Sequence, residues 1–203
     1  MTTCIVCQST DHNTLDKSCP RRLETPLTNI TAFKGKNNVF SNFYLCPLLV
    51  YGRSFKSAEH AYQFLKAKCY GKDQLAETIS RQINAYFAKR LARNIQPDEG
   101  WDHIKIDVMR DILIAKEKCV PEYRQHLLEA MDTLIVEAVP GDTFWSCGLS
   151  KDQLKWTTHW PGKNIMGLLH MERAIAMKAH MVDQSNGELS SIKYIDETCP
   201  KWV

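Results

Sequence analysis

The chain lacks any apolar run approaching the ~20 residues that a bilayer-spanning helix requires. It begins Met1-Thr2-Thr3-Cys4, without the basic and then apolar segments of a secretory signal. It also lacks a strong charge of one sign, because 26 Lys and Arg against 23 Asp and Glu leave a net charge of only +3. So small a positive net charge is compatible with a nucleic-acid partner but does not by itself indicate one. We therefore expect an intracellular protein, cytoplasmic or nuclear, with no membrane partner.

A disulfide framework is not expected either. The eight cysteines are scattered, and four of them lie in apolar or helical surroundings where a reduced thiol behaves as a small hydrophobe. Without a secretory signal, reduced thiols and a metal site are the better expectation. With 203 residues, 44% of them hydrophobic, the chain can bury around 70% of its unfolded surface in one core. One main domain is predicted.

The first 24 residues carry a C-x2-C-x4-H-x6-C pattern, which suits tetrahedral zinc. The segment resembles a zinc knuckle, but it has two extra residues before the last cysteine and Asp11 where a glycine often sits. Cys199 could substitute as a ligand. We expect a structural Zn²⁺, because so short a segment has no core of its own. The predicted ligands are Cys4, Cys7, His12 and Cys19.

The role of this module stays open between two alternatives. In the first, the module binds single-stranded nucleic acid, and Lys17, Arg21 and Arg22 contact phosphates. In the second, it is purely structural and its zinc holds the N-terminus to the main domain. The predicted organisation is a zinc module at 1–24, a main domain at 28–182 and a C-terminal tail at 183–203.

The main domain is predicted as a compact α+β fold, mostly helical, with short strands. Aromatic and branched residues broken by glycine, asparagine and proline indicate strands and turns over 30–55, with a hairpin tip at Tyr51-Gly52-Arg53. An apolar run from Thr133 to Val139 predicts a further strand, and Asn164 is expected to cap a helix through about Met181. The other predicted helices are 58–70, 73–80, 85–94, 99–118 and 121–131.

The helix that follows Ser57 holds the most informative side chains. Ser57 is a suitable N-cap residue, with His60 at the third helical position. Helical spacing projects Glu59, Gln63 and Lys66 within roughly 60° of one another. This line of an acid, an amide and an amine is either one wall of a reactive pocket or an ordinary solvated face.

Several motifs follow one another between residues 30 and 175. They are Phe40-Ser41-Asn42-Phe43, Glu59-His60, Gln63, Lys66, Trp101-x-x-x-Lys105-x-x-Val108-Met109, Leu134-Ile135-Val136-Glu137, Asp142-Thr143-Phe144-Trp145 and Gly162-Lys163-Asn164-Ile165-Met166-Gly167. In residue type and order, they resemble the motifs of the NADAR family of YbiA-like N-glycosidase domains.

The resemblance implies an enzyme that cleaves an N-glycosidic bond. Such cleavage builds positive charge on the anomeric carbon, and a carboxylate, here Glu59, can stabilise it and orient water. Alternatively the sugar ring opens and Lys66 or Lys105 forms a Schiff base; for both lysines the competing interpretation is a surface cation. The resemblance marks Asp142 as a second active-site carboxylate, although Pro-Gly-Asp also favours a plain turn. The predicted catalytic residues are Glu59, Lys66 and Asp142.

Substrate contacts are expected from aromatic rings and amides. Aromatic residues are more often core, and a histidine at this position is as readily a capping residue as a proton shuttle. The predicted substrate-binding residues are Asn42, Phe43, His60, Gln63, Trp101, Lys105, Trp145 and Asn164.

Two departures from the family pattern bear on the substrate. Trp145 is followed by Ser146-Cys147-Gly148 where the family often has Tyr-Trp-Gly, and 151–161 is long and rich in tryptophan. The knuckle-like segment favours an ADP-ribosylated nucleobase or nucleotide, with removal of ADP-ribose from guanine in DNA as the predicted reaction. The alternatives are hydrolysis of ribosylamine intermediates of riboflavin biosynthesis, and a non-catalytic reader of ADP-ribose or nucleic acid. No cofactor is expected for catalysis.

Overall fold

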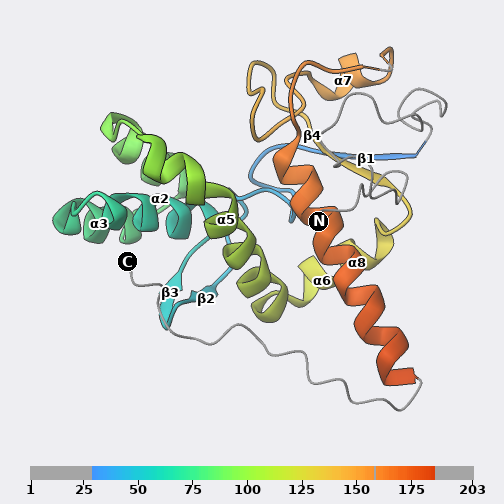
Figure 1. The fold of residues 1–203 in the computed structure, drawn as a ribbon, viewed down its shortest axis with the longest axis horizontal. Helices are drawn as coiled ribbons and strands as arrows, with labels where there is room; N and C mark the ends of the chain where they lie inside the picture. Colours follow the sequence, from blue (N-terminus) through green and yellow to red (C-terminus); the bar gives the residue numbers. More distant parts are fainter. Residues whose placement is uncertain (1–28, 158, 186–203) are drawn as a thin grey trace. The chain divides into compact units, whose positions relative to one another are not determined.

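The computed structural model describes residues 29–157 and 159–185 (Figure 1). Helices dominate over short strands, which confirms the α+β prediction. Contacts divide the described chain into two compact units, one containing 29–34 and 127–180 and the other containing 35–126 and 181–185. The predicted single domain over 28–182 stays a prediction, and the predicted zinc module lies outside the described residues.

The larger unit carries a hairpin and a set of helices, most of them where the sequence predicts them. Its elements are β2 (Leu48–Val50), β3 (Arg53–Phe55), α2 (Ala58–Cys69), α3 (Asp73–Ser80), α4 (Ala85–Leu91), the short 3-10 helix η1 (Ala92–Asn94) and α5 (Glu99–Cys119); α6 (Pro121–Glu129) begins in this unit and ends in the other.

Helix α2 is the element around which this unit packs. It contacts α3, α4, η1, α5 and β3, and most of its residues are buried. The predicted cap at Ser57 is confirmed, since its Oγ accepts from the backbone N of His60. Two further caps are made by Asn84 Oδ1, which accepts from the backbone N of Phe87, and by Asp98 Oδ1, which accepts from that of Trp101. Each cap satisfies an N–H group that the first turn leaves without an intrahelical partner.

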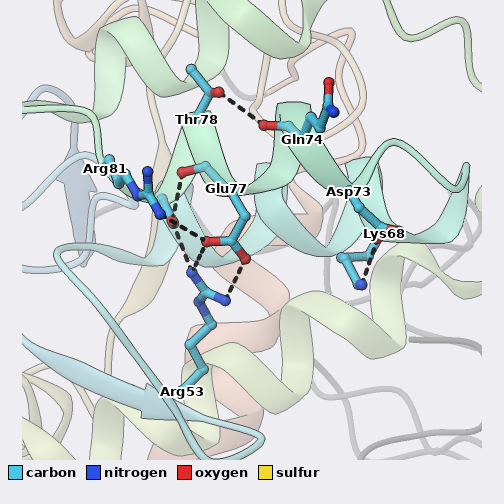
Figure 2. A network of polar contacts seen from close by, with 8 residues as sticks. Arg53, Lys68, Asp73, Gln74, Glu77, Thr78 and Arg81 are labelled. Atoms are coloured by element: carbon cyan, nitrogen blue, oxygen red, sulfur yellow. Dashed lines mark hydrogen bonds and ion pairs between the residues drawn. The ribbon is translucent and has the colours of Figure 1, made fainter.

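The β2–β3 hairpin turns at Tyr51 and Gly52, as predicted. Both residues have positive φ, 47° and 73°, which is the conformation that matches the twist of a two-residue hairpin. Arg53 then ties β3 to α3, because its guanidinium donates two hydrogen bonds of 2.7 Å to the carboxylate of Glu77 (Figure 2). The same guanidinium lies 4.3 Å from the ring centroid of Phe64 on α2. One side chain of β3 thus contacts both α3 and α2.

The smaller unit is built on two parallel strands that are far apart in sequence. β1 (Ile30–Phe33) pairs with β4 (Leu134–Glu137), and Ile30 lies opposite Leu134. A hydrogen bond of 2.7 Å between the hydroxyls of Thr31 and Thr133 adds to this pairing. Nothing in the local sequence predicts the partner of β1. The unit also contains α7 (Lys151–Leu154), which the sequence analysis missed, and α8 (Ile165–Ser185) up to His180. Helix α8 continues past the predicted end near Met181.

Asn164 and two glycines join β4 to the start of α8. Asn164 has a positive φ of 53°, its Nδ2 donates to the carbonyl of Ile135 at 2.9 Å, and its Oδ1 accepts from the backbone N of Glu137 at 3.0 Å. A Cβ on Gly167 would stand 2.1 Å from the Ile135 oxygen, and one on Gly162 would stand 2.2 Å from the Ser146 oxygen. The expected helix cap is therefore wrong in one respect: the Asn164 side chain bonds the backbone of β4.

Candidate functional site

Glu59 is a buried carboxylate near the start of α2. It is only 4% exposed, so the line it forms with Gln63 is not a solvated face. Its backbone N donates to the carbonyl of Asn42 at 3.0 Å, and its Oε1 accepts from Gln63 Nε2 at 2.8 Å. Its Oε2 has no hydrogen-bond partner among the described residues. One carboxylate oxygen is therefore fixed and the other remains available to a ligand or water.

The pKa of Glu59 reflects opposing influences. Burial raises the pKa, since a buried carboxylate loses its hydration, whereas the positive charge of Lys89 and the hydrogen bond from Gln63 lower it. Burial is the largest cause and the net direction is upward. The pKa of the Glu59 carboxyl group is therefore higher than that of an exposed glutamate.

Asn42 provides a second acceptor beside Glu59. Its Nδ2 lies 3.5 Å from the sulfur of Met109, while its buried Oδ1 has no partner among the described residues. Buried polar atoms are rarely left unbonded, and an exception calls for an explanation such as a missing ligand. Asn42 and Glu59 thus offer two free acceptor oxygens on residues joined by a backbone hydrogen bond.

Lys116 supports this loop and was missed by the sequence analysis. It is fully buried, and its Nζ donates to the carbonyl of Ser41 at 3.0 Å and lies 5.0 Å from the ring centroid of Tyr123. Burial lowers its pKa to about 8. Lys116 follows the apolar run 112–115 but precedes Glu117 and Lys118, so nothing in the local sequence showed that it would be buried.

Lys66 and Glu59 share a helix but have different hydrogen-bond partners. Its Nζ donates to the carbonyl of Ile95 at 2.9 Å. Burial lowers its pKa, Asp102 raises it and Lys105 lowers it further. Lys105 in turn pairs with Asp102 at 2.6 Å. The catalytic role of Lys66 stays a prediction, and the lysine that influences Glu59 electrostatically is Lys89, which the sequence analysis did not select.

His60 and Trp101 are buried by contacts within the protein. Nε2 of His60 lies 3.2 Å from the carbonyl of Gln82, which can only accept, so this nitrogen carries the hydrogen; Nδ1 then accepts from Ser57 Oγ at 2.8 Å. Trp101 is 2% exposed and lies 5.3 Å from Tyr62, ring centroid to ring centroid. Both rings support α2 in this structure, and their predicted substrate contacts stay predictions.

Asp142 and Trp145 belong to the other unit, as does Asn164. Asp142 Oδ1 accepts from the backbone N of Phe144 at 3.1 Å and of Trp145 at 2.9 Å, which is the side-chain bonding of a turn aspartate. Trp145 is half-buried and its ring lies edge-on to Phe144, with 5.0 Å between centroids. Asn164 uses both ends of its amide on β4. The catalytic role of Asp142 and the substrate contacts of Trp145 and Asn164 stay predictions.

The departure at Ser146 and Cys147 has a structural basis. Ser146 Oγ donates to the carbonyl of Glu137 at 2.6 Å and accepts from the backbone N of Val139 at 2.7 Å. Cys147 is buried in a cluster with Val136 and Leu154. These two small side chains hold the loop after Trp145 against β4.

The predicted metal ligands Cys4, Cys7, His12 and Cys19 lie outside the described residues, as does Cys199. Within 29–157 and 159–185, no group of three or more His, Cys, Asp or Glu side chains is placed to hold a metal ion. The described helices also include none that is long and apolar enough to cross a membrane.

Residues 31–174 match the model of the NADAR domain. The chain belongs to the NADAR family. The match contains each motif of the helical unit and of the β4–α8 region described above. The buried Glu59 and the unbonded Asn42 oxygen are therefore features of a NADAR domain.

Relatives of known name agree with this assignment. N-glycosidase YbiA of Escherichia coli is 31% identical over 135 residues, which is 66% of this chain and 77% of YbiA. The NMR structure of Escherichia coli YbiA superposes with a TM-score of 0.64 at 26% identity, covering 78% of this chain and 90% of that one. A riboflavin biosynthesis protein of Vibrio vulnificus is 34% identical over 110 residues, 53% of this NADAR chain and 29% of its own length.

Proposed function

We propose that this protein is an N-glycosyl hydrolase that removes ADP-ribose from ADP-ribosylated guanine in nucleic acid. The observation that carries the hydrolase part is the buried Glu59 carboxylate, whose Oε2 has no hydrogen-bond partner among the described residues, beside the unbonded Oδ1 of Asn42. The relatives named N-glycosidases support the same reaction class.

The arrangement suits charge development on a sugar. As the N-glycosidic bond breaks, positive charge builds on the anomeric carbon, and an ionised Glu59 stabilises it electrostatically in a site shielded from bulk water. The same carboxylate orients the attacking water. Asn42 Oδ1 can only accept a hydrogen bond, so a sugar hydroxyl is the natural donor to it. Phe43, half-buried next to Asn42, offers a ring face to the base or sugar.

The substrate part of the proposal rests on the N-terminal sequence. A zinc-knuckle-like segment is a feature of proteins that bind single-stranded nucleic acid, so it favours a polymeric substrate over a free metabolite. A second candidate is a ribosylamine intermediate of riboflavin biosynthesis, and the name of the Vibrio vulnificus relative supports it. A non-catalytic reader is a third outcome that the same experiment can reveal.

The test compares two substrates with the purified full chain. DNA carrying ADP-ribosylguanine and the ribosylamine intermediate are incubated separately, and released products are quantified by liquid chromatography and mass spectrometry. We expect free ADP-ribose and intact guanine from the DNA. Hydrolysis of the ribosylamine with no release from DNA would contradict the substrate, and turnover of neither would contradict the hydrolase.

Glu59→Gln tests the role of the carboxylate. It should lower kcat by a factor on the order of 10² to 10³, with substrate binding little changed, because a preorganised charge acts mainly in the transition state. Glu99→Gln, which changes an exposed carboxylate on α5, is the matched control and should retain activity. Binding by wild type without product release, and equal binding by Glu59→Gln, would instead indicate a reader.

A further inference from the structure

We propose that Lys89 on α4 is a positioning residue of the Glu59 site and supplies the positive charge that keeps this carboxylate ionised for the reaction. The inference rests on the proposed role of Glu59 as an anionic catalytic group. It adds a residue from a second helix, outside the motifs that identify the family.

The placement of Lys89 is defined by Phe43. Lys89 Nζ lies 5.5 Å from the centroid of the Phe43 ring, a contact in which the ring face attracts the ammonium group. Phe43 directly follows Asn42, whose carbonyl accepts from the Glu59 backbone N at 3.0 Å. Lys89 is exposed, Phe43 is half-buried and Glu59 is buried. Lys89 thus places its charge at the ring of Phe43, next to the residue that bonds the Glu59 backbone, and α4, which carries Lys89, packs on α2.

Glu59 needs such a cation because little else favours its ionised form. A buried carboxylate loses hydration, and a single amide hydrogen bond from Gln63 compensates only in part. Among the described residues, no salt bridge includes Glu59. The positive charge of Lys89 favours the ionised form of this carboxylate.

The other charged groups on elements around α2 have different partners or face solvent. On α5, Lys105 pairs with Asp102, and both influence Lys66. Elsewhere around α2, Arg53 of β3 pairs with Glu77 of α3, Asp73 of α3 pairs with Lys68 of α2, Arg90 of α4 lies over Phe87, and Arg93 of η1 is exposed. The other titratable groups of α5 are the pair of Arg110 and Asp107, Asp111 with Tyr51, the buried Lys116 on the Ser41 carbonyl, the half-buried Glu117, and the exposed Glu99, His103 and Lys118. Lys89 is thus the cation to substitute.

The experiment compares Lys89→Met, Lys89→Arg and Arg90→Met. Arg90→Met is the matched control, since Arg90 is the next residue on α4, is exposed and also lies over an aromatic ring, at 5.8 Å from the Phe87 centroid. Two quantities are measured: the titration midpoint of the Glu59 carboxyl carbon by ¹³C NMR, assigned by its loss in Glu59→Gln, and the acid limb of kcat against pH.

In Lys89→Met, both the titration midpoint and the acid limb should move to higher pH by about 0.5 to 1 unit, because the ionised form loses its cation. Below the midpoint this corresponds to a fall in kcat of about 3- to 10-fold. Lys89→Arg should restore the wild-type profile, and Arg90→Met should match wild type.

An equal midpoint in Lys89→Met and Arg90→Met would overturn the inference. So would a fall in kcat that does not depend on pH, or a failure of Lys89→Arg to restore the profile, because either would indicate a structural role. If no N-glycoside is turned over, the proposed function fails, yet the NMR titration still decides whether Lys89 sets the ionisation of Glu59.

Discussion

Lys66 is half-buried, and burial lowers the pKa of its amine, a property that favours the neutral, nucleophilic form. If the reaction opens the ribose ring, this amine should form an imine with the sugar. We predict that borohydride added during turnover traps a covalent sugar adduct on Lys66, found by peptide mass spectrometry, and that Lys66→Ala abolishes it.

The matched control for this trapping experiment is Lys68→Ala. Lys68 lies on the same helix but pairs with Asp73 at 2.6 Å, so its removal should leave the adduct in place. An adduct on Lys105 would move the nucleophile to α5. Absence of any adduct would leave direct attack by water, assisted by Glu59, as the mechanism.

Lys116 makes stability depend on pH in a definite direction. Its folded-state pKa is lowered from 10.5 to about 8, so the unfolded chain binds a proton more tightly than the folded one. The cost of burying the charge is fully present below pH 8 and disappears as pH rises through 10.5. The free energy of unfolding of wild type should therefore rise relative to Lys116→Met by about 2 kcal/mol between pH 7 and pH 9.5.

Chemical denaturation at several pH values measures this difference. The variant also loses the hydrogen bond to Ser41, but this loss is the same at every pH and does not affect the slope. Lys118→Met, at an exposed position on the same helix, should follow the wild-type slope. Parallel curves for wild type and Lys116→Met would show that the Lys116 pKa is not lowered.

At the scale of elements, the junction between β4 and α8 depends on the absence of a side chain. Gly167→Ala would place a Cβ 2.1 Å from the Ile135 oxygen and 2.3 Å from Asn164 Nδ2. The helix must then move away and break the hydrogen bonds of Asn164. We predict a loss of roughly 2 to 4 kcal/mol in the free energy of unfolding, measured by denaturant titration.

Gly100→Ala on α5 is the control for this substitution. Its added Cβ would meet only the Asp98 side chain, at 3.3 Å, and alanine favours the helix over glycine by about 1 kcal/mol. Its stability should be near or above that of wild type. Equal effects at the two positions would mean that the close approach at Gly167 does not hold α8 to β4.

Elements also show why local sequence predicted the helices better than the strand pairing. Ser57, Asn84 and Asp98 cap the helices that follow them, and a cap acts within three residues. The parallel partner of β1 is β4, about a hundred positions away. The sequence of a four-residue strand is too short to specify which other strand it pairs with. The pairing of β1 with β4 is therefore visible only in the folded chain.

At the scale of the whole molecule, the N-terminal segment yields a prediction independent of the described residues. We expect the purified full chain to contain one zinc ion per molecule, lost in Cys4→Ser and in Cys7→Ser, because removing one thiolate breaks a tetrahedral site. Elemental analysis by mass spectrometry measures it, with Cys119→Ser as the control.

Both ligand variants should keep most of their activity on a small nucleotide substrate, since the module is expected to act on nucleic acid or as a staple. Metal-free wild type with a folded N-terminus would contradict the site. Complete loss of activity in the variants would show that the module supports the main domain.

The amino-acid sequence alone determined most of the helices, the cap at Ser57, the hairpin tip and the shared helix face of Glu59 and Gln63, because each depends on residues within a few positions of one another. It also carried the NADAR motifs. Tertiary structure decided which polar groups are buried: Glu59, Asn42 and Lys116 could equally have faced solvent on the pattern alone. Tertiary structure also decided that the Asn164 side chain bonds the backbone of β4 and that Lys89 lies over Phe43, because contacts between elements form only when distant segments pack together.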